Sequence, residues 1–553
     1  MNIKKLATTI FSISLLSSCS NIIDALDSGE TSVKGLKKDK LEIVFSHNIN
    51  GETHPCGCRH FPLGGLPQIA GQLETLKKDA DVLYVDTGDT LFISSKIPDS
   101  IRQSSIYNAE QVASAMDKIG LDYFVPGDQD FAAGVEFLAN ISKNSKFTFL
   151  ISNIRDESII KHKKWVVLKK GPHKIYLTGL VFPDTIAFQH QKDLLSPTKS
   201  LNKVMSEITK DGFDTKNEFH RLIVLSHGGI DNDEALAKKF PQIEWIIGAH
   251  SQSFTRLPIK EAKKTKIVQV LSRNHYLGNI TIALDKGRKG DSFQIHEMRE
   301  ERAKGLSPNP WFEFIDTHKS NLTKVQQKEQ EATSFQVEGI VKHNTAASCI
   351  SCHDDQASHW QDSAHSIAYM TLVQAKEQNN LACVKCHALG TSTAKGFSKA
   401  SDIIVTEKEI EGTISDKETA KLLKMKEDYW NVLRKDFKDV KSIRDLSAKK
   451  IRKLSNKWLK LDEKSKISHN FANVQCLNCH DKHQDHPFIT GEAVLSKDQK
   501  YEAIKGKCLS CHNSDQSPAW YEQDKKGLPT KLNLKKFNKI YDQLACPKKK
   551  EEE

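Results

Sequence analysis

Apart from its first residues, the chain of 553 residues lacks any apolar run long enough to cross a membrane. It also lacks segments in which lysine or arginine clusters with aromatic residues, and only 7% of its residues are aromatic. Its net charge of +11 therefore indicates a solvated basic surface, suited to an acidic protein partner, and no nucleic-acid interface. Because the length exceeds one ordinary hydrophobic core, we expect two or three domains.

Cysteine, in contrast, is strongly patterned, since Cys-x-x-Cys-His occurs four times between residues 349 and 512. Two cysteines at this spacing can form thioethers to a haem, and the next histidine can bind the iron as proximal ligand. A zinc site, a redox dithiol or a disulfide would not need a histidine after each second cysteine. The motifs predict four haem c groups. The attachment residues are Cys349, Cys352, Cys383, Cys386, Cys476, Cys479, Cys508 and Cys511, and the proximal ligands are His353, His387, His480 and His512.

The N-terminus predicts export. Residues 1–18 combine two early lysines with a short apolar stretch, as in a signal peptide. Residues 16–19 resemble the lipobox of bacterial lipoproteins, which implies cleavage before Cys19 and a lipid on its thiol; a plain secretory signal is the alternative. We therefore expect an extracytoplasmic protein anchored to a bacterial membrane, in the periplasm or at the outer membrane, with residues 19–40 as a flexible tether.

Residues 41–285 alternate short apolar runs with amphipathic segments, which predicts an α/β layered domain. Strands are expected at 41–45, 82–85, 148–151, 174–181, 221–225, 245–247, 266–271 and 279–284, and helices at 66–78, 105–119 and 201–208. Carboxylates and imidazoles follow several of these strands, on or beside glycine turns: Asp89 comes after Val85, Asp128 after Phe124, His227 after Leu225 and His250 after Ile247. Since strand ends meet at one edge of such a sheet, we expect these side chains to gather as metal ligands.

The order and spacing of these polar residues resemble the calcineurin-like metallophosphoesterases, most closely their 5′-nucleotidase and UDP-sugar hydrolase branch. That family binds two metal ions. The resemblance implies that one metal position, for zinc, manganese or iron, is formed by Asp89, Asp128, His227 and His250.

The second metal position of that family is degraded here. It would need Asn48, Asn50 and Gln252 beside Asp89, and Gln129 replaces the histidine that assists the leaving group. Two-metal hydrolysis requires both ions, so we expect ordinary nucleotidase activity to be weak or absent and assign no catalytic residue. A scaffold in which the remaining polar residues only bond to each other is the alternative.

Cys56 and Cys58 follow the degraded first motif directly. A Cys-x-Cys there could supply soft metal ligands or a redox pair, or be a buried pair with neither role. Similar Cys-Gly-Cys insertions occur in nucleotidase-like domains fused to multihaem cytochromes, which this chain resembles.

Around the first two haem motifs, the segment from Trp360 to Leu372 resembles the cytochrome c-554-like tetrahaem family, and the resemblance covers most of residues 343–525. It implies a mostly α-helical, haem-cored domain at 343–546. We see no extensive core apart from the haems and expect residues 343–525 not to fold without them. Distal iron ligands implied by the resemblance are His365 and His486; by proximity His343, His469 and His483 are further candidates, although each could equally be a surface histidine.

The remaining segments connect or extend these domains. Residues 286–342 are expected to be a linker, 404–466 an insertion of two or three amphipathic helices, and 547–553 a charged tail. The sequence as a whole predicts a membrane-anchored electron carrier that docks an acidic redox protein. Two alternatives stay open: a one-metal nucleotidase with a redox module, and a reductase of a small nitrogen or oxygen substrate at a five-coordinate haem.

Overall fold

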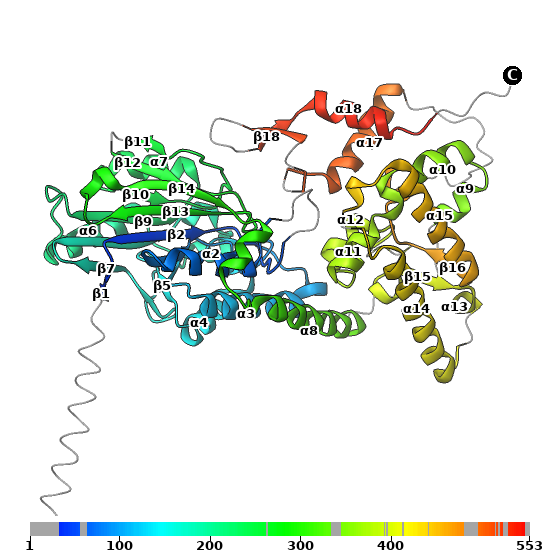
Figure 1. Cartoon of the computed structure of the whole chain (residues 1–553), viewed down its shortest axis with the longest axis horizontal. Helices are drawn as coiled ribbons and strands as arrows, with labels where there is room; N and C mark the ends of the chain where they lie inside the picture. The colour runs from blue at the N-terminus through cyan, green and yellow to red at the C-terminus, as the bar shows by residue number, and fades with distance from the viewer. Residues whose placement is uncertain are drawn as a thin grey trace, which may run out of the picture.

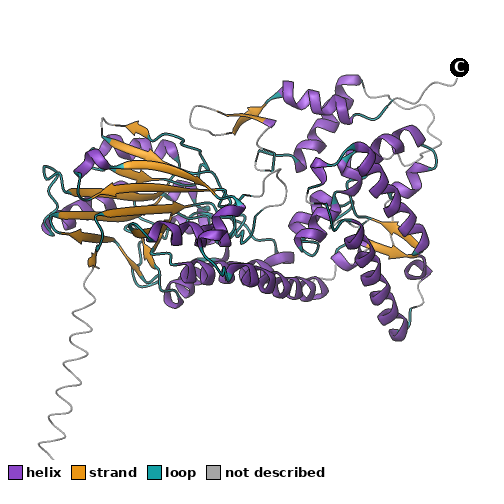
Figure 2. Ribbon diagram, in the orientation of Figure 1, coloured by secondary structure: helices purple, strands orange, loops and turns teal. Residues whose placement is uncertain are grey.

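The computed structural model describes residues 33–55, 63–261, 264–332, 344–391, 393, 396–411, 414–440, 442–480, 496–514, 516–517, 520–523 and 529–547. They form an α/β domain and a mostly helical domain, with a long helix running between them (Figures 1 and 2). Some predicted features lie outside the described residues. These are the signal and lipid site with Cys19, the pair Cys56 and Cys58, the candidate ligands His343, His483 and His486, and residues 548–553 of the tail.

The described part of the α/β domain contains two seven-stranded sheets. The first is ordered β1 (Val33–Gly35), β7 (Trp165–Lys170), β8 (His173–Val181), β9 (His220–His227), β10 (Trp245–Ile247), β12 (Thr265–Val268) and β11 (Ile259–Glu261). The second is ordered β14 (Ser292–Glu297), β13 (Tyr276–Ala283), β2 (Lys40–Ser46), β3 (Asp81–Asp86), β4 (Tyr123–Phe124), β5 (Thr148–Leu150) and β6 (His162–Lys163). All eight predicted strands and the three predicted helices have a counterpart.

The alternation of side chains along β9 explains the layers. Ile223 and Leu225 belong to the core between the two sheets, whereas Leu222 and Val224 belong to a second core under the helices α6 (Pro197–Lys210) and α7 (Ile230–Lys239). Helices α2 (Leu66–Lys77), α3 (Arg102–Ile119) and α4 (Val135–Asn144) add apolar side chains to the first core. Both faces of β9 are therefore buried, as its continuous apolar run requires.

Two strands lie where connecting segments were expected. β1 falls within the expected tether and pairs in parallel with β7. β14 falls within the expected linker and pairs antiparallel with β13. Both are edge strands. β1 has only three residues, and β14 has only two apolar residues, Phe293 and Ile295, so neither gives a strong apolar signal. The sheets therefore extend the domain beyond residues 41–285 on both sides.

Helix α8 (Trp311–Ala332) connects the two domains. It lies along α3 in Figure 1, and its further residues meet the helical domain. The amide of Gln330 donates to the carbonyl of Asn379 at 2.9 Å and accepts from the backbone N–H of Ala400 at 2.9 Å. Lys319 lies 3.7 Å from the carboxylate of Glu377. Much of the expected linker is thus an ordered helix held at both ends.

The described part of the helical domain contains helices of 4 to 21 residues and two small β-ribbons. Its elements are α9 (Ala346–Ile350), α10 (Asp354–Gln361), η6 (Ala364–Ile367), α11 (Tyr369–Ala375), α12 (Leu381–His387), β15 (Ile404–Thr406), α13 (Glu407–Glu411), α14 (Asp416–Asp436), α15 (Ala448–Lys464), β16 (Ile467–Asn470), α16 (Cys476–Cys479), α17 (Lys497–Cys511), β17 (Tyr521–Gln523), β18 (Pro529–Leu532) and α18 (Leu534–Leu544). No helix in the described part of the chain is long and apolar enough to span a bilayer.

The expectation that this domain lacks a core of its own was wrong for one part. Ile367 and Tyr369 of the haem-motif region are buried together with Leu433 of α14 and Trp458 of α15. The inserted segment, predicted as two or three helices, thus supplies a core through α14 and α15. In contrast, α17 buries no side chain and α18 only Phe537. That the segment of α17 and α18 folds only with bound haem stays a prediction.

Candidate functional site

Four side chains converge where strands of the two sheets end. Asp89 and Asp128 follow β3 and β4 of the second sheet, whereas His227 ends β9 and His250 follows β10 of the first. One ligand atom from each lies within 4.8 Å of the others. The structure therefore brings together the four residues that were predicted to form one metal position. Two carboxylates and two imidazoles are a donor set that fits a zinc, manganese or iron ion.

Tight turns aim these side chains. Asp89 has φ 58° and His250 has φ 69°, both in the left-handed region that costs free energy for residues other than glycine. Gly127 has no room for a side chain, because a Cβ there would lie 2.3 Å from Asp89 Oδ1 and from His227 Cε1. Glycine is thus required for the turn to approach the ligands this closely.

His227 is held between two carboxylates. Its Nδ1 donates to the carbonyl of Thr87 at 2.6 Å, and its Nε2 lies 3.2 Å from Asp128 and 3.4 Å from Asp89. Burial alone would lower the pKa of His227, but the two carboxylates raise it well above its usual value. A cation that binds these carboxylates would compete with the imidazole proton, so metal binding here should release protons.

The amide of Asn48 takes a different role from a metal ligand. The backbone N–H of Val270 donates to His47 Nε2 at 2.8 Å, so His47 carries its proton on Nδ1. That Nδ1 donates to Asn48 Oδ1 at 2.8 Å, and Asn48 Nδ2 in turn donates to Asp89 Oδ2 at 2.8 Å. A fixed N–H donor thus faces the carboxylate oxygen that would otherwise bind the second metal.

Two other positions that the second metal would need carry amide side chains. Asn50 and Gln252 lie in turns with left-handed backbone, at φ 58° and 48°, where the family resemblance implies histidines. The backbone N–H of Gln129 donates to Asp89 Oδ1 at 2.8 Å. Of the four residues that the second position would need, only Asp89 carries a carboxylate.

The haem motifs of the helical domain lie at the ends of α9, α12, α16 and α17. His387 Nδ1 lies 2.9 Å from the carbonyl of Ala368, which can only accept, so Nδ1 carries the proton. His512 Nδ1 bonds to Ser517 Oγ at 2.9 Å. In both residues the contact at Nδ1 orients the ring, as the second ring nitrogen of histidine iron ligands does in proteins.

Known proteins resemble the two halves separately. Residues 348–408 match the family model described as cytochrome c554 and c-prime. The N-terminal half is 23% identical over 252 residues to mouse 5′-nucleotidase, covering 40% of this chain and 41% of the relative, and 26% identical over 237 residues to the Vibrio cholerae 5′-nucleotidase, covering 39% and 41%. The chain thus spans less than half the length of these curated relatives.

Solved structures align with the same half. The 5′-nucleotidase precursor of Thermus thermophilus aligns with TM-score 0.42 and 18% identity, over 61% of this chain and 67% of its own. The sulfate thiohydrolase SoxB of the same organism aligns with TM-score 0.40 and 17% identity, over 50% and 60%. The chain joins a 5′-nucleotidase-like domain to a cytochrome c554-like domain. The cytochrome family implies bound haem.

In the nucleotidase-like domain, sequence analysis missed the role of Asp130. Its buried carboxylate accepts the backbone N–H groups of Asp89, Thr90, Leu91 and Gly127 at 2.8–3.0 Å. Asp130 therefore holds together the two turns that carry Asp89 and Asp128. In the sequence, Asp130 looks like any other acidic residue that follows a strand. Its role could have been inferred only from the backbone N–H groups of these turns, which need a hydrogen-bond acceptor.

In the cytochrome domain, haem motifs from distant parts of the sequence lie side by side. Cys386 lies close to Cys511, and Cys476 lies close to Cys349. The second motif thus meets the fourth, and the first meets the third. Haems attached at such neighbouring sites would lie close to one another.

His365, the first of the predicted distal ligands, lies beside one proximal histidine. Its ring centroid is 6.3 Å from that of His512, with the ring planes inclined by 56°. By contrast, His469 is half-buried in β16, where its ring stacks on Phe471 at 6.2 Å. The described residues therefore bring one distal candidate to a proximal histidine and leave the other apart.

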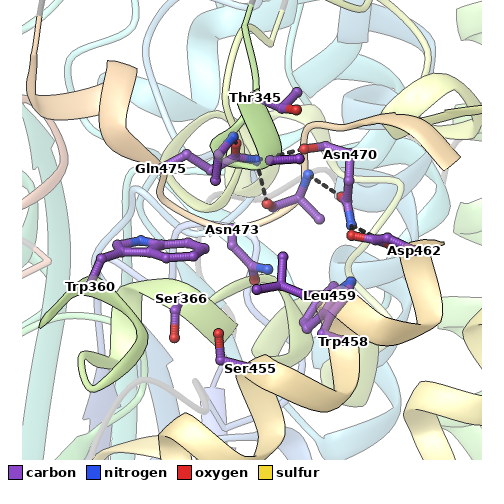
Figure 3. A pocket seen from close by; sticks show the side chains of 13 residues that line it. Thr345, Trp360, Ser366, Ser455, Trp458, Leu459, Asp462, Asn470, Asn473 and Gln475 are labelled. Atoms are coloured by element: carbon purple, nitrogen blue, oxygen red, sulfur yellow. Dashed lines mark hydrogen bonds between the residues drawn. The ribbon is translucent and has the colours of Figure 1, made fainter. Parts of the chain in front are cut away.

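A hydrogen-bond network connects the first and third motifs (Figure 3). Gln475, directly before Cys476, accepts from the backbone N–H of Ala346 at 2.6 Å and donates to the carbonyl of Asn470 at 2.7 Å. Asn470 in turn donates to Asp462 at 2.9 Å. These residues line a small cavity of about 30 Å³, enough for a water molecule or two. Sequence analysis did not identify this network, because each partner is an ordinary amide or acid.

Proposed function

We propose that the chain is a membrane-anchored, extracytoplasmic tetrahaem cytochrome that carries electrons, fused to a nucleotidase-like domain that binds at most one metal ion. Four Cys-x-x-Cys-His motifs, one pair overlapping the matched cytochrome family, carry the proposal. Their pairwise proximity supports electron transfer between haems. The bound haems would supply the electron chemistry, while this chain provides thioether cysteines and oriented imidazoles.

The deciding experiment is a haem count. Protein matured in a host that assembles c-type cytochromes should give four haems per chain in the pyridine haemochrome assay and a reducible low-spin spectrum. A colourless protein with free or zinc-bound thiols would contradict the proposal. Binding of carbon monoxide by the reduced protein would instead favour a reductase, because it requires an iron open on one face.

The distance between His365 and His512 supports an iron with a histidine ligand on both faces. Two imidazoles on opposite sides of one iron, with metal–nitrogen bonds of about 2.0 Å and about 1.2 Å from nitrogen to ring centre, have centroids roughly 6.4 Å apart. The distance of 6.3 Å is compatible with this arrangement, so these two imidazoles could hold one iron between them. We therefore assign His365 as the distal ligand of the fourth haem, whose proximal ligand is His512.

For the nucleotidase-like domain, we propose one metal bound by Asp89, Asp128, His227 and His250, without ordinary hydrolysis of nucleotides. The side-chain N–H of Asn48 donates to Asp89 Oδ2. This bond supports a single ion, because it occupies a lone pair of the carboxylate oxygen that a second metal ion would need. Metal analysis after zinc or manganese loading should give one ion per chain, and none in Asp89→Asn. In Asn48→Asp, which replaces the donor by an acid, tighter metal uptake is expected. Turnover of nucleoside monophosphates or UDP-sugars that disappears in Asp89→Asn would refute the proposed inactivity.

The location outside the cytoplasm is supported by the cytochrome family, and the lipid anchor by the residues before Cys19. Labelled palmitate should enter the wild-type protein, which should sediment with membranes. Cys19→Ser should abolish both. If the wild-type protein is exported but takes up no labelled palmitate, residues 1–18 act as a plain secretory signal and the lipid anchor is refuted.

A further inference from the structure

One face of α15 in the cytochrome domain carries an unpaired row of lysines. At about 100° per residue, the side chains of Lys449, Lys453, Lys460 and Lys464 fall within about 60° of one another around the helix. All four are exposed, and none forms an ion pair with a residue that the structure describes. We call these four residues the lysine face.

Ion pairs border the lysine face without neutralising it. Arg452 binds both oxygens of Asp362 on the α10 side, at 2.6 and 2.5 Å, and Lys457 pairs with Asp436 of α14. These contacts fix α15 against both neighbouring segments and pair the carboxylates of Asp362 and Asp436 with residues outside the lysine face. On α15 itself, the one exposed acid is Glu463, at the margin of the row. The row therefore stays positive and rigidly placed.

The opposite face of α15 packs on the segment that carries His365. Ser455 and Trp458 of α15 line the same small cavity as Ser366 of η6 (Figure 3). His365 is the neighbouring residue of Ser366. Because a helix with its side chains is about 10 Å thick, one helix separates the lysine face from the segment of the proposed distal ligand.

We propose that the lysine face of α15 docks an electron-transfer protein that presents carboxylates around its redox centre. The inference rests on the proposed function as electron carrier and adds the site of exchange. Complementary charge steers such partners and raises the association rate by roughly 10- to 1000-fold at low salt. The docked partner would lie over the fourth haem, across a single helix.

The test uses the full-length haem-loaded protein with all four lysines of the face changed to glutamine, which keeps helix propensity nearly unchanged. The matched control changes Lys143, Lys199, Lys210 and Lys239 to glutamine; all four are exposed and belong to the nucleotidase-like domain. Both variants lose four positive charges. The probe is a reduced plant-type ferredoxin, a small acidic redox protein, mixed with the oxidised cytochrome in a stopped-flow instrument at low salt and at about 0.2 M salt, where steering is screened.

At low salt, we expect the second-order rate to fall at least about tenfold in the variant of the lysine face and to lose most of its salt dependence. The control should stay within about twofold of the wild type, and dithionite should reduce all three proteins equally. Equal rates in the two variants would overturn the docking site. So would a loss of binding to anionic vesicles without a change in the ferredoxin rate, since the face would then bind membrane lipid. A protein without haem would instead refute the proposed function.

Discussion

Replacing His365 by alanine should open one haem face and leave the other haems unchanged. If His365 and His512 share an iron, as their 6.3 Å separation indicates, the variant loses one of eight axial ligands. One iron in four then becomes five-coordinate or binds water. About a quarter of the haem should therefore turn high-spin in the ferric state, and about one carbon monoxide should bind per reduced chain.

Visible and electron paramagnetic resonance spectra measure the high-spin fraction of the haem, and titration measures the carbon monoxide bound per chain. The matched variant is His469→Ala, since the ring of His469 stacks on Phe471; it should stay low-spin at every iron. A His365→Ala protein that contains four haems, remains fully low-spin and binds no carbon monoxide would refute the assignment. Imidazole added to the variant should restore the low-spin spectrum, which a misfolded domain would not do.

Three further results are expected. In Gly127→Ala, the added methyl group would meet Asp89 and His227 at 2.3 Å, so calorimetry should show zinc affinity reduced by about 100-fold. In Trp458→Ala, loss of a side chain that is 2% exposed should cost roughly 3–5 kcal/mol of unfolding free energy, measured by denaturant titration. Burial raises the pKa of Asp462 from 3.8 to about 6. The native state therefore holds this proton more tightly, and unfolding free energy should fall by at most about 3 kcal/mol as pH rises through 4–6. Asp462→Asn should remove that dependence.

The strands of the nucleotidase-like domain, and the convergence of four polar side chains at their ends, could be predicted because the signals are local. A buried strand such as β9 is a continuous apolar run, and His227 is its last residue. The family resemblance then named four of the polar residues at strand ends as candidate metal ligands. The haem motifs are even more local, because attachment and proximal ligation are contained in five consecutive residues.

The rest depends on contacts between distant residues. The orientation of the Asn48 amide follows from His47, whose tautomer is set by Val270, 223 residues further along the chain. The sequence alone shows an amide at position 48 and leaves open whether its oxygen or its nitrogen faces Asp89. In the same way, the lysines of α15 were visible as charge, but their separation from the buried face appears only once Trp458 packs against the cytochrome domain.

The geometry of the nucleotidase-like site argues against a scaffold without a ligand. Asp89 and His250 both keep left-handed backbone, which costs roughly 1–3 kcal/mol at each position. The buried carboxylate of Asp130 accepts four backbone N–H groups in the turns that carry Asp89 and Asp128. These turns hold the two acids close to the two imidazoles of the site. A domain that served only to fold would gain from relaxing these turns, since mutual hydrogen bonds do not require four ligand atoms within 4.8 Å. A single cation would offset both the strain and the repulsion between the carboxylates, and the donor from Asn48 to Asp89 agrees with the proposal of one ion.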